Sequence, residues 1–222
     1  MMPCFFTNKK RCAPAAWRLR GRSPWGSVMG IIVLTTALEG CGSGRPIKYY
    51  GLNYPKTAQV ASGAIDVTLM VRPFQANPLY LDDKIVYGFD SPEMGTYENH
   101  RWFEPPVESL QDALVRGLLA SGKFRAVYSL GSGMNGRFIL GGHLYDFKEV
   151  DLNPMVARLS YEARLSDRKT GSTVWSHFYS HDEPASEKSI IAFVLAMDKN
   201  VQSSVQEVQG GLEEYFRAHP LN

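Results

Sequence analysis

The chain has 222 residues, of which 44% are hydrophobic, and its formal net charge is +2, so it is long enough for one domain with its own core. That weak charge, with no cluster of Lys and Arg after the N-terminal segment, excludes the footprint of a nucleic-acid-binding protein. Cys4, Cys12 and Cys41 all precede residue 42, which excludes a disulfide framework or a cysteine-ligated zinc in the rest of the chain.

Residues 1–40 are predicted to form a secretory signal peptide. A basic segment precedes an apolar run from Val28 to Leu38, and Leu38-Glu39-Gly40-Cys41 ends that run in the order of a bacterial lipobox. The run is much shorter than the roughly 20 apolar residues that a membrane span needs. We therefore expect cleavage before Cys41 and attachment of a thioether-linked diacylglycerol with palmitate-type acyl chains to this cysteine, which anchors the protein to a membrane.

The residues around this cleavage site add three expectations. Glu39 departs from the small or hydroxyl residue usual at its position, and the long segment before the apolar run leaves open a start downstream of Met1. Gly42 follows the cysteine, at the position where an aspartate would favour retention at the inner membrane. We therefore expect the protein to be anchored in the outer membrane and to face the periplasm. The mature chain keeps 18 of 24 basic and 21 of 22 acidic residues, a net charge near −3, and residues 41–47 form a short lipidated tether.

Four strands are predicted before the first helix. Residues 48–53 form the first, and 65–71 alternate apolar and polar side chains, which is typical of a half-buried strand. Residues 84–89 and 96–101 flank a Pro- and Gly-containing loop and therefore predict a hairpin. Pro105-Pro106 then opens an amphipathic helix, because proline is tolerated in the first turn, and Ser121-Gly122 ends it.

Four further strands and a long helix are predicted after that point. The strands span 126–130, 138–147, 155–165 and 172–180, with turns over 131–136 and 167–171. The helix spans about 186–216, with an apolar stripe at steps of three and four. The pattern predicts a single α+β domain over residues 48–217, an antiparallel or mixed sheet with two amphipathic helices packed on one face, and a tail at 218–222.

The sequence contains no convincing catalytic, cofactor or metal motif. Gly131 to Gly136 matches a dinucleotide fingerprint letter for letter, but a strand follows it instead of a helix, so we interpret it as a hairpin loop. His177 and His181 lie four residues apart in an extended segment, about 13 Å, too far to share one ion. Ser132 lacks the frame of a nucleophile elbow. We therefore expect a protein that is not an enzyme and carries no cofactor or metal.

Several local motifs resemble those of one known family. They are Tyr49-Tyr50-x-Leu52, Arg72-Pro73-Phe74, Leu79-Tyr80-Leu81-Asp82, Ile85-Val86-Tyr87, His100-Arg101-Trp102-Phe103-Glu104-Pro105-Pro106 and Tyr145-Asp146-Phe147. Together with the lipobox, they make the chain similar to the ABC-type transport auxiliary lipoproteins, which include the PqiC-like lipoproteins. The resemblance covers roughly residues 48–216, and its most specific part is the Arg-Trp block before the helix.

The resemblance implies partners rather than chemistry. It implies a non-enzymatic lipoprotein that forms a homo-oligomer. The partners it implies are MCE-domain and ABC transporter subunits of an intermembrane lipid transport system. The candidate interface residues are Tyr49, Tyr50, Arg101 and Trp102. Structural roles would also explain their presence: Trp102 could seal the core and Arg101 could bond nearby acceptors. The two tyrosines could pack along an edge strand. A structural or assembly lipoprotein of the envelope and a periplasmic hydrolase are the alternative functions.

Overall fold

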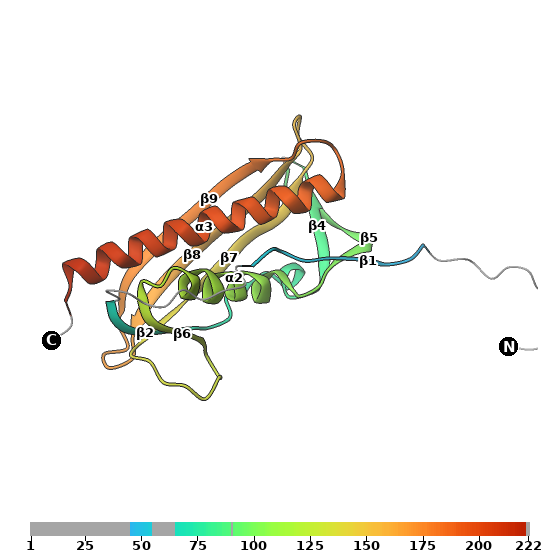
Figure 1. Cartoon of the computed structure of the whole chain (residues 1–222). Helices are drawn as coiled ribbons and strands as arrows, with labels where there is room; N and C mark the ends of the chain where they lie inside the picture. The colour runs from blue at the N-terminus through green and yellow to red at the C-terminus, as the bar shows by residue number, and fades with distance from the viewer. Residues whose placement is uncertain (1–44, 55–64, 90, 221–222) are drawn as a thin grey trace, which may run out of the picture. The chain divides into compact units, whose positions relative to one another are not determined.

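The computed structural model describes residues 45–54, 65–89 and 91–220, which belong to one compact unit (Figure 1). Cys41 and most of the predicted tether lie outside the described residues. In chain order the elements are β1 (Lys48–Tyr50), β2 (Ile65–Val71), β3 (Gln75–Ala76), the 3-10 helix η2 (Pro78–Tyr80), β4 (Lys84–Gly88), β5 (Met94–Trp102), α2 (Pro106–Ala120), β6 (Phe124–Ser129), β7 (Phe138–Val150), β8 (Val156–Asp167), β9 (Thr173–Pro184) and α3 (Ile190–Ala218).

Strand β7 is the spine of a mixed nine-stranded sheet. One edge of β7 pairs antiparallel with β8 over its whole length, and β8 pairs antiparallel with β9. The other edge of β7 is shared in turn by β2, β3 and β4, all parallel to it. From β4 the sheet continues through antiparallel β5 to parallel β1, and from β2 it continues to parallel β6.

Both helices cover one face of this sheet (Figure 1), as the sequence predicts. Pro105 is the N-cap of α2, and the Ser189 hydroxyl caps α3 by accepting a hydrogen bond from the Ala192 N–H. The helices approach closely at Gly117, where a Cβ atom would lie 2.4 Å from a methyl carbon of Val205. Glycine at this position therefore sets the distance between the helices.

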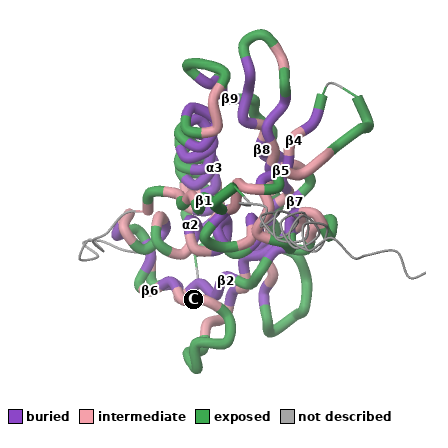
Figure 2. The backbone as a smooth tube through the Cα atoms, turned by 90° about the vertical axis from the view of Figure 1, so that its right-hand side faces the viewer, coloured by how far each residue is buried: buried purple, intermediate pink, exposed green. Residues whose placement is uncertain are grey.

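The core lies between the helices and the inner face of the sheet. Its fully buried side chains include Leu69, Leu110, Phe147, Leu159 and Phe193. Burying such a side chain contributes about 1.5–3 kcal/mol, so this layer supplies most of the stability. Figure 2 shows buried residues along the central strands and α3, and exposed residues in the loops.

Most predicted elements are confirmed, including the strand at 65–71, the 84–101 hairpin and the turn at 167–171. The interpretation of Gly131 to Gly136 as a hairpin loop is wrong. Strands β6 and β7 both run parallel to β2 and lie on its two sides, so the segment between them crosses over the end of β2. The long helix starts at Ile190 instead of about residue 186, because Ser189 provides the cap. The first strand ends at Tyr50 instead of Asn53.

Candidate functional site

The four candidate interface residues lie together at the β1 edge of the sheet. The parallel pairing of β1 with β5 aligns Tyr49 with Arg101 and Tyr50 with Trp102. Strand β1 stands at one end of the strand order, and within the described part of the chain only β5 pairs with it (Figure 1). Its other edge is therefore open to a partner.

The outward side of this edge carries a pair of exposed aromatic rings. Tyr49 is 50% exposed and Phe103 is 71% exposed. The two rings stack with their centroids 6.1 Å apart and an interplanar angle of 10°. The Phe103 N–H also donates a 2.7 Å hydrogen bond to the carbonyl of Tyr50, which fixes the backbone beneath the rings. This aromatic pair is the part of the edge that can contact another molecule.

Arg101 and Trp102 hold the edge in place from its two opposite faces. The Arg101 guanidinium donates a 2.6 Å hydrogen bond to Asp83, and this bond raises the pKa of the arginine. Trp102 is only 1% exposed, with ring centroids 5.4 Å from Phe147 and 5.9 Å from Phe193. Trp102 thus seals the end of the core, and Phe103, not named as a candidate, faces outward in its place. The alternation of side chains along a strand is the signal that could have identified it.

A polar network extends inward from Tyr50. The Tyr50 hydroxyl lies 2.8 Å from Nδ1 of His100, and burial, followed by the charge of Lys48, lowers the pKa of this histidine. The His100 ring packs edge-on against Tyr97, with the centroids 5.7 Å apart. The Tyr97 hydroxyl donates to the buried Glu149 carboxylate at 2.9 Å. Sequence reasoning missed Tyr97 and Glu149, although a glutamate near the end of a mostly apolar strand was a visible signal.

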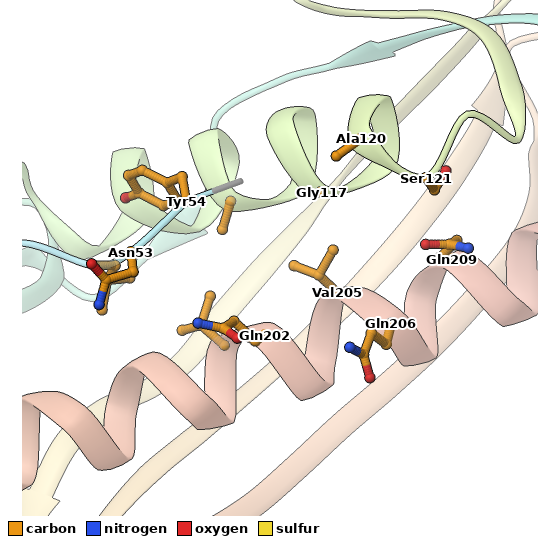
Figure 3. Close-up of a pocket in the computed structure, with 12 residues that line it drawn as sticks. Asn53, Tyr54, Gly117, Ala120, Ser121, Gln202, Val205, Gln206 and Gln209 are labelled. Atoms are coloured by element: carbon orange, nitrogen blue, oxygen red, sulfur yellow. The ribbon is translucent and has the colours of Figure 1, made fainter. Parts of the chain in front are cut away.

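A groove of about 450 Å³ separates α2 from α3 (Figure 3). Figure 3 shows Tyr54, together with Gly117 and Ala120 of α2, on one side of the groove. The other side carries Gln202, Gln206 and Gln209 of α3. The described residues that line it include no carboxylate, histidine or cysteine. Amide and apolar groups of this kind suit contact with a polypeptide or an apolar chain better than acid–base chemistry.

The histidines of β9 are bound to carboxylates of the protein itself. Nε2 of His177 lies 2.6 Å from Glu207, and Nε2 of His181 lies 3.5 Å from Glu183. Across residues 45–54, 65–89 and 91–220, no group of three His, Cys, Asp or Glu side chains could hold a metal ion. No helix in the same ranges is long and apolar enough to cross a membrane.

Comparisons with known proteins agree with this fold. Residues 50–209 match the family described as ABC-type transport auxiliary lipoprotein component. Protein XCC0632 from Xanthomonas campestris is 20% identical with a TM-score of 0.67, over 77% of this chain and 98% of that one. A second solved structure, of an uncharacterised protein, has 13% sequence identity and a TM-score of 0.61, over 76% of this chain and 99% of that one.

These two likenesses show a shared fold and no more, since both identities are low. A search of curated proteins finds no significant match. The family match, in contrast, covers more than half of the chain and includes the β5 and α2 segments that carry the Arg-Trp block. The chain therefore belongs to the ABC-type transport auxiliary lipoprotein family.

Proposed function

We propose that this protein is a non-enzymatic lipoprotein, anchored by acylated Cys41 to the outer membrane and facing the periplasm. There it serves an ABC transport system that contains MCE-domain subunits and moves lipids between the two membranes. The observation that carries the proposal is the family match over residues 50–209, which begins nine residues after the cysteine of the predicted lipobox. Two or more acyl chains bind a membrane stably, whereas a single chain binds reversibly.

The β1 edge supports a docking role. Strand β1 starts seven residues after Cys41, so a fully extended tether spans at most about 25 Å. The exposed pair of Tyr49 and Phe103 then stays close to the anchored membrane, where a transport conduit would meet it. Aromatic side chains are enriched at protein interfaces because they bury a large area with few rotatable bonds.

We also propose that the protein works as a homo-oligomer. Strand β9 pairs only with β8 among the described strands. Proteins usually cover or blunt open edges, because unpaired backbone groups recruit other strands. Contacts between copies would cover the β9 edge here.

Cross-linking in intact cells tests the partner, with mass spectrometry of the captured proteins and of the N-terminal peptide. The proposal predicts an acylated Cys41 peptide together with MCE-domain or ABC transporter subunits. Recovery of porins or envelope-assembly factors instead would favour a structural lipoprotein. An N-terminal peptide that begins at Met1 would contradict the anchor.

The variant Cys41→Ser tests the anchor directly. It removes the thiol that receives the lipid, so we expect the protein to leave the outer-membrane fraction and transport to fail while residues 48–216 stay folded. Cys12→Ser is the matched control, since it makes the same chemical change within the predicted signal peptide. Unchanged localisation of Cys41→Ser would disprove anchoring at this residue.

A further inference from the structure

A second cavity opens where β5 leaves the regular ladder of the sheet. Lys84 of β4 pairs with Arg101 of β5, but Val86, only two residues later, pairs with Thr96, which is five residues away from Arg101. The extra β5 residues form a bulge that directs Tyr97 and His100 to the cavity wall, and such bulges often re-aim side chains at functional sites. The cavity measures about 910 Å³, within the usual range of small-molecule sites.

The wall of this cavity holds a buried negative charge. Glu149 is only 5% exposed, and its hydrogen-bond donor is the hydroxyl of Tyr97, at 2.9 and 3.1 Å from the two carboxylate oxygens. Among the described residues no Lys or Arg forms an ion pair with Glu149, and the neighbouring Lys188 bonds Asp151 instead, at 2.7 Å. A buried carboxylate without a cation is costly, so a bound cation would stabilise this site.

Aromatic rings surround the carboxylate in a way that also favours a cation. Tyr87 and Tyr97 lie with their ring centroids 4.8 Å apart, and both line the cavity. The faces of such rings attract ammonium groups through their quadrupole. Glu149 accepts N–H hydrogen bonds, so a primary ammonium gains more here than a quaternary one, which has no N–H to donate.

The same cavity carries two free cations on its other wall. Arg45 and Lys48 line it and are exposed, and neither forms an ion pair with any other described residue. Lys48 lies on β1 and Glu149 on β7, three strand positions apart, which is about 14 Å measured across the sheet. Long side chains close much of this distance from both sides, which leaves room for a short ligand with opposite charges at its ends.

We propose that this cavity binds the headgroup of an ethanolamine phospholipid, with the ammonium on Glu149 and the phosphate on Arg45 and Lys48. The proposal rests on the proposed membrane anchor for its source of ligand. Arg45 follows Cys41 by four residues, at most about 14 Å of chain, so an acylated Cys41 would hold the cavity at the lipid surface. A glycerol headgroup would leave Glu149 without a cation and is expected to bind weakly.

The first test uses soluble headgroups and the full mature protein in a neutral detergent. Titrations followed by ligand-observed NMR compare sn-glycero-3-phosphoethanolamine with sn-glycero-3-phosphoglycerol. We expect the ethanolamine compound to bind at least about tenfold more tightly, the effect of one hydrogen bond to a charged group. Equal affinities would overturn the proposal.

The variant Glu149→Gln separates the site from general folding. Its amide oxygen can still accept from Tyr97, so the fold is kept, but the charge that holds the ammonium is gone. We expect about a tenfold loss of ethanolamine headgroup binding and no change with the exposed control Glu93→Gln. Undiminished binding by Glu149→Gln would place the ligand elsewhere and contradict the proposal.

A second arm identifies the source of the ligand. Native mass spectrometry of protein released from nanodiscs that contain both phosphatidylethanolamine and phosphatidylglycerol should show bound phosphatidylethanolamine, which Glu149→Gln loses. If the soluble headgroup binds but the lipid does not, the cavity takes a free phosphoamine and the lipid assignment is wrong. Neither arm depends on the transporter partners, so failure here is distinct from failure of the cross-linking test.

Discussion

Consecutive residues at the end of β5 have opposite environments. Trp102 is 1% exposed and packs on Phe147 and Phe193, whereas Phe103 is 71% exposed and stacks on Tyr49. The most recognisable sequence block of this chain therefore combines a core residue with a surface residue. Mutations in the block have to be interpreted one residue at a time, because loss of function at Trp102 would report folding before it reported binding.

Two alanine variants test this division. Trp102→Ala leaves a cavity in the core and should lower the free energy of unfolding by about 3–5 kcal/mol. Phe103→Ala removes a ring that is mostly in water and should change the free energy of unfolding by less than about 1 kcal/mol. Urea unfolding followed by circular dichroism measures both values. Similar losses for the two variants would show that the buried and exposed assignments are wrong.

Glu149 should make stability depend on pH. Burial, and then the charge of Asp151, raise its pKa above the ordinary 4.5, while Tyr97 and Lys188 oppose this shift. As the pH rises above 4.5, the unfolded chain releases the proton while the folded chain still holds it, so stability falls until the raised pKa is passed. Below pH 4.5 the carboxyl is protonated in both states and the penalty is absent.

Glu149→Gln isolates this effect, because glutamine does not ionise. As the pH rises from about 4 to about 8, the variant should become more stable relative to the wild type, measured as the difference in their free energies of unfolding. Urea titrations at a series of pH values give this difference. A constant difference across the range would mean that Glu149 titrates in the folded protein as it does in the unfolded chain.

At the scale of elements, the contact between α2 and α3 depends on one glycine. Gly117→Ala would place a Cβ atom 2.4 Å from a Val205 methyl carbon and force the helices apart, a loss of about 1–3 kcal/mol. Gly210→Ala on α3 is the matched control, since its Cβ meets nothing within 4 Å and the better helix propensity should stabilise by about 0.5–1 kcal/mol. Thermal unfolding compares the two variants.

A second substitution shows whether the clash is the cause. Val205→Ala removes the methyl groups that the new Cβ would meet, so the double variant should recover part of the loss seen for Gly117→Ala alone. Strictly additive losses would show that α2 and α3 do not interfere at this point.

Sequence patterns predicted the elements well where local chemistry decides them. The alternation at 65–71 defined β2 to the residue, and Pro105-Pro106 marked the start of α2. The order of strands in the sheet was not predictable, because β7 pairs with β2, β3 and β4 along a single edge. Neither the period of two nor the loop lengths encode such sharing, and the crossover at residues 131–136 was misread for the same reason.

The candidate site was predictable only in part. Tyr49, Tyr50, Arg101 and Trp102 were found through their local motifs, and the β1–β5 pairing brings them together. The cavity beside Glu149 was not predictable, since residues more than 100 positions apart line it. A three-residue slip in the pairing of β4 with β5 places Tyr97 there, and no local sequence signal specifies such a slip.

At the scale of the whole molecule, exposed aromatic side chains form two separate pairs. One is Tyr49 with Phe103 at the β1 edge. The other is Tyr145 of β7 with Phe178 of β9, with centroids 5.9 Å apart and exposures of 46% and 59%. Only the first pair contains a residue close in sequence to the proposed anchor, Tyr49, so we expect only the first pair to meet the transport system.

Matched double variants decide between the pairs. Tyr49→Ser with Phe103→Ser should reduce the transporter subunits recovered by cross-linking at least about tenfold, because loss of two interface aromatics costs several kcal/mol of binding free energy. Tyr145→Ser with Phe178→Ser removes a similar exposed area and should leave recovery unchanged. Both variants should remain folded by circular dichroism, since all four rings are at least 46% exposed. If the second variant alone loses the partners, docking takes place through the β7–β9 face, and the membrane-proximal edge is left for contacts between copies.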